Sequence, residues 1–196
     1  MDNEVLIIYA HPKTTIAGNC QHILEAVKKQ LGCNSKQYKL LDLYTENFNP
    51  VMSASEHYVS GGKQINPDIE RYQCLFKKSK YIVLIHPIWW GGMPAILKGF
   101  FDRLLTPGFG YKYIKGIPHK LFKDKKAVVF QTSGGPWWWT NVVQNARARY
   151  NIKNDILGFV GIESHVLLLT NARAVTEKQK ERIRKLTKRG LKKLWQ

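Results

Sequence analysis

Five short apolar runs alternate along the chain with segments of helical periodicity, and this order restricts the fold more than any other feature. The runs cover residues 5–10, 38–43, 81–85, 127–131 and 166–169. Several are continuously apolar, which is typical of parallel strands with helices packed on both faces. The helical segments cover residues 19–31, 67–78, 94–105, 141–157 and 176–196. This repeat predicts an α/β fold, a doubly wound five-stranded parallel sheet with right-handed crossovers and helices on both faces.

Length and composition favour one cytoplasmic domain. The chain has 196 residues, of which 44% are hydrophobic, and we expect a single domain over residues 1–196. The acidic start lacks the basic region of a signal peptide, and no apolar run approaches the roughly 20 residues that span a bilayer. The three cysteines are widely spaced, with no Cys-x-x-Cys pair and no His-Glu-x-x-His segment. A reducing compartment and the absence of a structural metal are therefore expected.

The formal net charge of +17 raises the question of a nucleic-acid or anionic membrane partner. Residues 176–196 contain nine Lys or Arg and two Glu. An apolar face at helical spacing runs through the same segment, formed by Ile183, Leu186, Gly190, Leu191 and Leu194. The basic residues are therefore interpreted as the solvated face of a packed helix. Nucleic-acid binding is disfavoured because no recognition motif accompanies the charge, whereas an anionic cofactor or partner is compatible with it.

The helix expected over residues 94–105 has the clearest pattern. Pro94 suits the first turn, and Lys98, Asp102 and Arg103 fall on the side opposite the apolar stripe. The stripe consists of Ile96, Leu97, Phe100, Phe101, Leu104 and Leu105. This pattern predicts a helix with one buried face.

Other signals mark helix ends and loops. Gly32 lies where a helix C-cap is expected, and Thr176 with Gln179 has the spacing of a capping box. Two connections, 44–66 and 106–125, are long and rich in aromatic, Gly and Pro residues. Loops of this length in a compact domain are usually functional or mobile.

The loop after the first apolar run suits a phosphate group. In an open parallel sheet, ligands bind at the carboxyl ends of the strands. The loop begins with His11 and reaches the expected helix start at Asn19, so an imidazole, hydroxyl groups and free helix N–H groups lie close together. It has no Walker motif, and no Gly-x-Gly-x-x-Gly occurs in the chain. The alternative is a capped polar turn without a ligand.

Two further loops combine aromatic and small residues. After the third run, Trp89 and Trp90 precede two glycines, a combination that suits a planar ring packed against the backbone. Core packing of the tryptophans is the alternative. After the fourth run, residues 132–135 offer hydroxyl and N–H groups to a polar ring edge, and three tryptophans follow at 137–139. These tryptophans are expected to line a pocket or a subunit interface.

The chain resembles the flavodoxin-like NAD(P)H dehydrogenase (quinone) family. This family includes NAD(P)H:quinone oxidoreductases, the modulator of drug activity, and ancillary flavoproteins of glutathione-gated potassium efflux. The matching segments are Ala10-His11-Pro12, Asp42-Leu43-Tyr44, Phe48-Asn49-Pro50, the continuous stretch 86–103 that begins His86-Pro87-Ile88-Trp89-Trp90-Gly91-Gly92, residues 107–113 and Thr132-Ser133-Gly134-Gly135. They extend over most of the chain, and the stretch 86–103 is the most specific.

The resemblance implies a flavin site. His11, Thr15 and Asn19 would lie at the flavin phosphate. The isoalloxazine ring would contact Pro87, Ile88, Trp89, Trp90 and Gly91. Its pyrimidine side would contact Thr132, Ser133, Gly134 and Gly135. The loop after His11 is one residue longer than the usual family pattern, and Pro-Trp-Trp-Trp follows Gly135 where relatives carry a tyrosine and a histidine that assist hydride transfer. No catalytic residue is therefore assigned.

The resemblance also implies an activity. A flavoprotein of this kind takes hydride from NADH or NADPH onto flavin N5 and passes two electrons to a quinone-like acceptor, with the bound flavin supplying the redox chemistry. FMN is favoured, with FAD as the alternative, because no C-terminal extension is present to hold an adenine. A homodimer is expected, with the partner chain completing the pocket. One alternative is a regulatory flavoprotein that docks on a membrane potassium-efflux transporter, and another is a basic nucleic-acid-associated domain without flavin.

Overall fold

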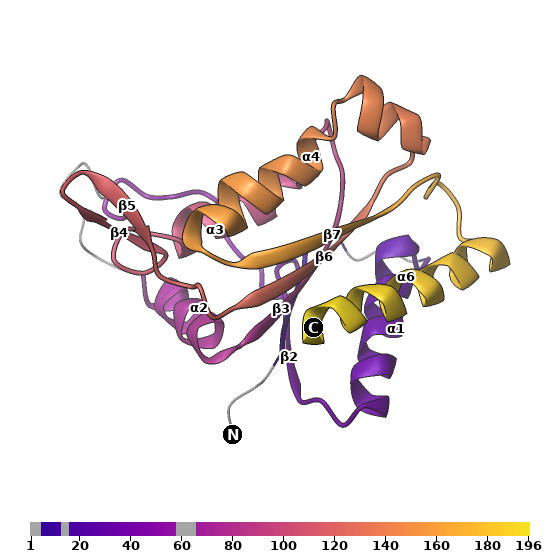
Figure 1. Ribbon diagram of the computed structural model, residues 1–196, viewed down its shortest axis with the longest axis horizontal. Helices are drawn as coiled ribbons and strands as arrows, with labels where there is room; N and C mark the ends of the chain where they lie inside the picture. Colours follow the sequence, from indigo (N-terminus) through magenta and orange to yellow (C-terminus); the bar gives the residue numbers. More distant parts are fainter. Residues whose placement is uncertain (1–4, 13–15, 58–65) are drawn as a thin grey trace.

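The computed structural model describes residues 5–12, 16–57 and 66–196, and its centre is a five-stranded parallel sheet (Figure 1). The strand order is β2-β1-β3-β6-β7. The strands are β1 (Val5–Tyr9), β2 (Tyr38–Asp42), β3 (Tyr81–Pro87), β6 (Lys126–Thr132) and β7 (Glu163–Leu169). This order reverses between β1 and β3, as in a flavodoxin-like doubly wound sheet, and it confirms the predicted fold class.

Helices cover both faces of the sheet. On one face lie α1 (Asn19–Cys33) and α6 (Glu177–Trp195), drawn indigo and yellow in Figure 1. On the other lie α2 (Pro67–Lys78), α3 (Ala95–Leu104) and the segment that follows β6. Side chains of β1 alternate between two apolar cores, since Val5 and Ile7 belong to the core of α1 and α6 while Leu6 and Ile8 belong to the other. The buried face of α6 confirms that its basic residues lie on the solvated side.

The segment between β6 and β7 is not the single helix expected over 141–157. It consists of η2 (Trp139–Val143), α4 (Arg147–Tyr150), η3 (Asn151–Leu157) and α5 (Gly158–Val160), where η2 and η3 are π-helical. The prediction was wrong because Asn145 and Ala146 have φ of 50° and 49°, which interrupts the helical backbone between η2 and α4.

Part of the long connection 106–125 forms a hairpin. Its strands are β4 (Tyr111–Ile114) and β5 (Ile117–Lys120), which pair antiparallel. The two turn residues, Lys115 and Gly116, have φ of 51° and 79°, as a two-residue type I′ turn requires. The sequence analysis treated 106–125 as one long connection and did not predict this hairpin.

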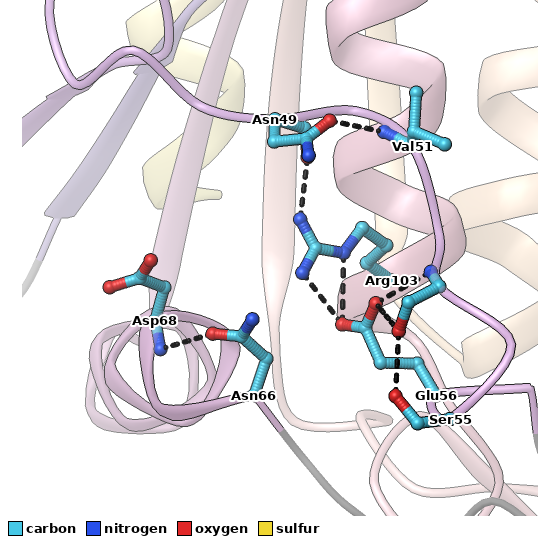
Figure 2. Close-up of polar contacts among 8 residues, drawn as sticks. Asn49, Val51, Ser55, Glu56, Asn66, Asp68 and Arg103 are labelled. Atoms are coloured by element: carbon cyan, nitrogen blue, oxygen red, sulfur yellow. Dashed lines mark hydrogen bonds and ion pairs between the residues drawn. The ribbon is translucent and has the colours of Figure 1, made fainter.

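The described part of the connection 44–66 is held against α3 by a buried ion pair (Figure 2). Arg103 donates from Nε and Nη2 to Glu56 Oε1, at 3.0 and 2.6 Å, and from Nη1 to the carbonyl oxygen of Asn49. Arg103 was predicted on the solvated side of its helix, and this prediction was wrong. The buried face of α3 is wider than its apolar stripe because residues 49–56 cover one flank of the helix.

Two predicted helix ends differ in detail from the structure. α1 continues through Gly32 to Cys33, and Asn34 is the C-cap. Thr176 accepts a hydrogen bond from the Gln179 N–H, which confirms half of the capping box. The Gln179 amide instead donates to the carbonyl oxygens of Thr170 and Asn171, so it ties α6 to the loop after β7. Within the described ranges, every helix is too short or too polar to cross a bilayer.

Candidate functional site

A pocket of about 580 Å³ lies at the carboxyl ends of the strands, where the loops after β1, β3, β6 and β7 meet. Its size is within the roughly 300–1,000 Å³ typical of small-molecule sites. The lining consists of His11, Ile16, Ala17, Gly18, Asn19, Cys20, Pro87, Ile88, Trp89, Thr132, Gly134, Ala172, Arg173, Ala174 and Val175. The three loops that the sequence singled out therefore converge on one pocket.

The N-terminus of α1 forms one end of this pocket and is open for an anion. The N-cap residue Gly18 provides no side-chain cap, and the first turn contains no acidic residue. Among the described residues, nothing accepts a hydrogen bond from the N–H groups of Asn19, Cys20 or Gln21. Free N–H groups and the positive end of the helix dipole together attract a phosphate.

Asn19 joins this helix end to the loop after β7. Its Nδ2 donates to the carbonyl oxygens of Ala172 and Ala174, at 3.1 and 3.4 Å. Its Oδ1 is buried and has no hydrogen-bond partner in the part of the chain that the structure describes. Buried polar groups are nearly always paired, so this acceptor fits a ligand that brings a hydroxyl donor, such as a ribityl chain.

A tight turn shapes the loop after β3. Trp89 and Gly92 exchange both of their backbone hydrogen bonds, each at 2.9 Å, and Trp90 and Gly91 between them have φ of 51° and 74°. The Trp89 ring lies 6.3 Å from that of His11 and lines the pocket, whereas Trp90 is fully exposed. Of the five residues expected at the ring, Pro87, Ile88 and Trp89 line the pocket, while Trp90 and Gly91 lie outside its lining.

The loop after β6 contributes two of its four expected residues to the lining, Thr132 and Gly134. Ser133 is buried, where its Oγ lies 3.3 Å from Thr140 Oγ1 and accepts a hydrogen bond from the Gly135 N–H. Ser133 and Gly135 therefore stabilise the conformation of this loop without lining the pocket. Of the residues expected at the phosphate, His11 and Asn19 line the pocket, and Thr15 falls outside the described residues.

Sequence reasoning missed the fourth wall of the pocket. Residues 172–175 follow β7 and line the pocket, and Arg173 donates from Nε to the carbonyl oxygen of Gly134 at 3.0 Å. The guanidinium brings a positive charge to a pocket that also contains the α1 N-terminus. The available signal was topological, because the end of the fifth apolar run had to reach the same edge of the sheet as the other strands.

Two buried neutral side chains belong to the pocket lining or adjoin it, Cys20 in the lining and His86 next to Pro87. Complete burial lowers the pKa of His86 to about 4, although its ring Nδ1 lies 2.9 Å from the Pro87 carbonyl oxygen and donates to it. Burial raises the pKa of the Cys20 thiol to about 11, and its Sγ lies 3.3 Å from Thr132 Oγ1. Both side chains are therefore neutral at pH 7, and Arg173 and the dipole of α1 bring positive charge to the described part of the pocket.

The strand order and a phosphate-compatible pocket at the switch point define the class of flavodoxin-fold ligand-binding proteins. The sequence matches the flavodoxin-like fold family over residues 3–194, and the chain belongs to this family. This result confirms the resemblance inferred from the motifs.

Named relatives within this group are oxidoreductases. The chain is 36% identical over 131 residues to an NAD(P)H oxidoreductase of Haemophilus influenzae, a match that covers 66% of this chain and 63% of that protein, just under two thirds of its length. It is 31% identical over 144 residues to an FMN-dependent NADH:quinone oxidoreductase of Lachnoclostridium phytofermentans, with 72% and 70% of the two chains covered. The solved NAD(P)H:quinone oxidoreductase of Methanothermobacter marburgensis superposes with a TM-score of 0.85, at 26% identity over 98% of this chain and 96% of the other.

Proposed function

We propose that the protein is an FMN-dependent NAD(P)H oxidoreductase that passes two electrons to a quinone-like acceptor. The observation that carries this proposal is the pocket itself. In it an arginine occurs together with a helix N-terminus and a buried acceptor, Asn19 Oδ1, for which the described residues provide no side-chain cap and no hydrogen-bond donor. The named activities of the relatives, including the FMN dependence of the Lachnoclostridium enzyme, support it.

The residues present fit a flavin mononucleotide. The free N–H groups of the first turn of α1, with His11 and Arg173, would hold the phosphate, and the Asn19 oxygen would accept from a ribityl hydroxyl. Pro87, Ile88 and Trp89 would contact the ring, and Thr132 and Gly134 its polar edge. When bound, the flavin supplies the two-electron chemistry. The protein binds and orients it, and the overall positive charge favours approach of an anionic nicotinamide nucleotide.

Flavin titration followed by anaerobic reduction tests this function. We expect FMN added to the purified protein to bind with a change in its visible spectrum. NADH or NADPH should then bleach the flavin bands, and a water-soluble benzoquinone should restore them. FAD is titrated in parallel to decide between the two cofactors. Failure to bind either flavin would refute the proposal, whereas binding without reduction by either nucleotide would refute the oxidoreductase activity alone.

A matched pair of variants locates the flavin in the pocket. Arg173→Met removes the charge that lines the pocket, and we expect it to weaken FMN binding by about tenfold, the cost of one charge-assisted contact of roughly 1.4 kcal/mol. Arg184→Met removes the same charge from the exposed side of α6, where Arg184 pairs with Glu181, and should leave the affinity within twofold. Equal losses in both variants would indicate a nonspecific charge effect.

We also propose that two copies associate through an exposed aromatic surface, defined here as Trp137, Trp138, Trp139, Val142 and Val143. Their relative exposures run from 44% to 65%, which is unusual for five large apolar side chains close together in the sequence. Sedimentation of the wild type is expected to give a dimer, and the double variant Trp138→Ser with Val142→Ser a monomer. A monomeric wild type at micromolar concentration would refute this assignment.

A cytoplasmic location is part of the proposal and is supported by the cysteines. Cys20, Cys33 and Cys74 are all free thiols, and the latter two are exposed, which suits a reducing compartment. Neither the fold nor the named relatives favours a role in potassium efflux, so the enzymatic function is the one we propose.

A further inference from the structure

A second pocket, of about 380 Å³, lies beside the edge strand β7, away from the flavin pocket, and is surrounded by positive charge. Arg149 and Lys153 are four residues apart on the segment that runs from α4 into η3, and Arg189 and Lys193 are four residues apart on α6. In Figure 1, β7 runs between this orange segment and the yellow helix α6. Two rows of cations therefore face one cavity from opposite sides of the sheet edge.

The described residues give these four cations no carboxylate partner. Within the described ranges, no ion pair involves Arg149, Lys153, Arg189 or Lys193, although other basic residues of α6 pair with Glu177 and Glu181. One acidic group, Glu163, lies beside the lining, with its carboxylate 3.9 Å from Nε2 of the lining residue His165. The two cations of each row, four residues apart, repel one another. An anion bound in the cavity would reduce this repulsion.

The environment of His165 reflects the same field. Burial and then the charge of Lys193 lower the pKa of this imidazole; Glu163 opposes them, and Lys153 and Lys126 lower it further. The histidine is thus largely uncharged at neutral pH and can donate or accept a hydrogen bond. The edge of β7 adds backbone groups, because alternate residues of an edge strand direct their N–H and C=O groups away from the sheet.

Protection of the sheet edge does not explain this arrangement. Charges that prevent edge-to-edge pairing are usually carried by the edge strand itself. Here the four cations come from the flanking helices and line a concave space, and Tyr150 adds a half-exposed ring to the lining. A cavity with cations on two sides and an aromatic face has the properties of a phosphate site with room for a base.

We propose that this pocket binds a small ligand with two or more adjacent phosphate groups, of the nucleoside diphosphate class. The paired cations on either side would each neutralise phosphate oxygens. The Arg149 guanidinium lies over one face of the Tyr150 ring, 5.5 Å from its centroid, so a base would stack on the other face. No residue lines both this pocket and the flavin pocket, so the site is separate from the proposed redox centre.

Calorimetric titration of the full chain tests this site. The probes are inorganic pyrophosphate, ADP and inorganic phosphate, each with and without saturating FMN. We expect pyrophosphate and ADP to bind at least tenfold more tightly than inorganic phosphate. The double variant Lys153→Gln with Lys193→Gln should weaken both by at least tenfold. The control Lys188→Gln with Lys192→Gln removes the same charge from α6 outside the pocket and should change the affinity by less than twofold.

Each result decides the proposal. Absence of pyrophosphate and ADP binding to the wild type, equal losses in the two double variants, or equal affinity for inorganic phosphate and pyrophosphate would overturn it. If ADP binds more tightly than pyrophosphate and Tyr150→Leu removes the difference, the ligand is a nucleotide. If the two bind equally, the diphosphate group alone is recognised, and the site stands without the base. Circular dichroism confirms that the variants are folded.

Discussion

Replacing Gly99 with alanine should destabilise the protein even though alanine is the better helix former. Gly99 lies in the middle of α3, and the segment around Pro50 packs directly on it. A Cβ atom at this position would overlap the carbonyl oxygen of Pro50 and would lie 2.5 Å from its Cβ and 2.7 Å from its Cα. Because two of these atoms belong to the backbone, the clash cannot be relieved by a change of rotamer.

The magnitude follows from two opposing effects. Alanine in a helix interior gains about 1 kcal/mol over glycine. Overpacking of this kind costs typically 1–3 kcal/mol, and a clash with backbone belongs near the upper end or beyond. We therefore expect a net loss of about 1–2 kcal/mol in the free energy of unfolding, which is a fall in Tm of roughly 2–8 °C for a chain of this size.

Urea unfolding followed by circular dichroism measures this loss, and Gly32→Ala provides the matched control. Gly32 is also helical, but nothing lies within 4 Å of its added Cβ, so the same substitution should stabilise the protein by up to about 1 kcal/mol. Opposite signs for the two variants are the expected result. Equal or higher stability of Gly99→Ala would refute the reasoning, because it would mean that Pro50 does not press on α3 in solution.

Three further predictions concern buried charge and backbone strain. His86→Phe should flatten the loss of stability between pH 6.5 and 4. The buried imidazole has a pKa of about 4 in the folded state, so the unfolded chain binds more protons in that range. Unfolding at pH 7.5 and 4.5 should reveal roughly 2.5 kcal/mol of difference in the wild type from this group. Glu56→Gln should cost about 3–5 kcal/mol at pH 7 by leaving Arg103 buried without its partner. Burial alone would raise the pKa of Glu56, but hydrogen bonds from Arg103 and Ser53 lower it overall. The contribution of the Glu56 carboxylate to the free energy of unfolding is therefore present above pH 4.5 and is lost as the pH falls through the lowered pKa. An acid titration of the stability of wild type and variant would measure this loss. Trp90→Gly should raise the free energy of unfolding by about 1 kcal/mol, because a φ of 51° strains a bulky residue. An unchanged Tm would contradict this strain. A flavin titration of the same variant reports whether the indole contacts the flavin ring.

The fold could be predicted from the sequence because its strands are apolar runs and its helices have apolar stripes, both of which depend on local spacing. The features that were missed depend on residues far apart in the chain. Arg103 looked like a surface residue because nothing near it in sequence indicated that Glu56 would cover it. The break at Asn145 and Ala146 was missed because the flanking residues keep helical periodicity across it.

The candidate site was predictable to the extent that topology determines it. Parallel strands end at one edge, so the loops that begin at His11, Pro87 and Thr132 had to converge there. The sequence could not indicate which side chains of each loop face inward. The type I′ geometry of the turn at Trp90 and Gly91 places both outside the pocket lining, and the bond from Ser133 to Thr140 turns that hydroxyl away from the lining.

The hydrogen bonds of the loop after β7 have a consequence for ligand affinity. Asn171 and Ala172 donate backbone N–H groups to Gly135 and Ser133, while Gln179 and Arg182 of α6 hold the carbonyl oxygen of Thr170. These hydrogen bonds order this wall of the pocket before a ligand binds. The free energy of binding therefore does not have to offset the entropic cost of ordering it, roughly 1–2 kcal/mol for each residue. Affinity should therefore depend on Gln179 and Arg182, two side chains of a helix that does not line the pocket at all.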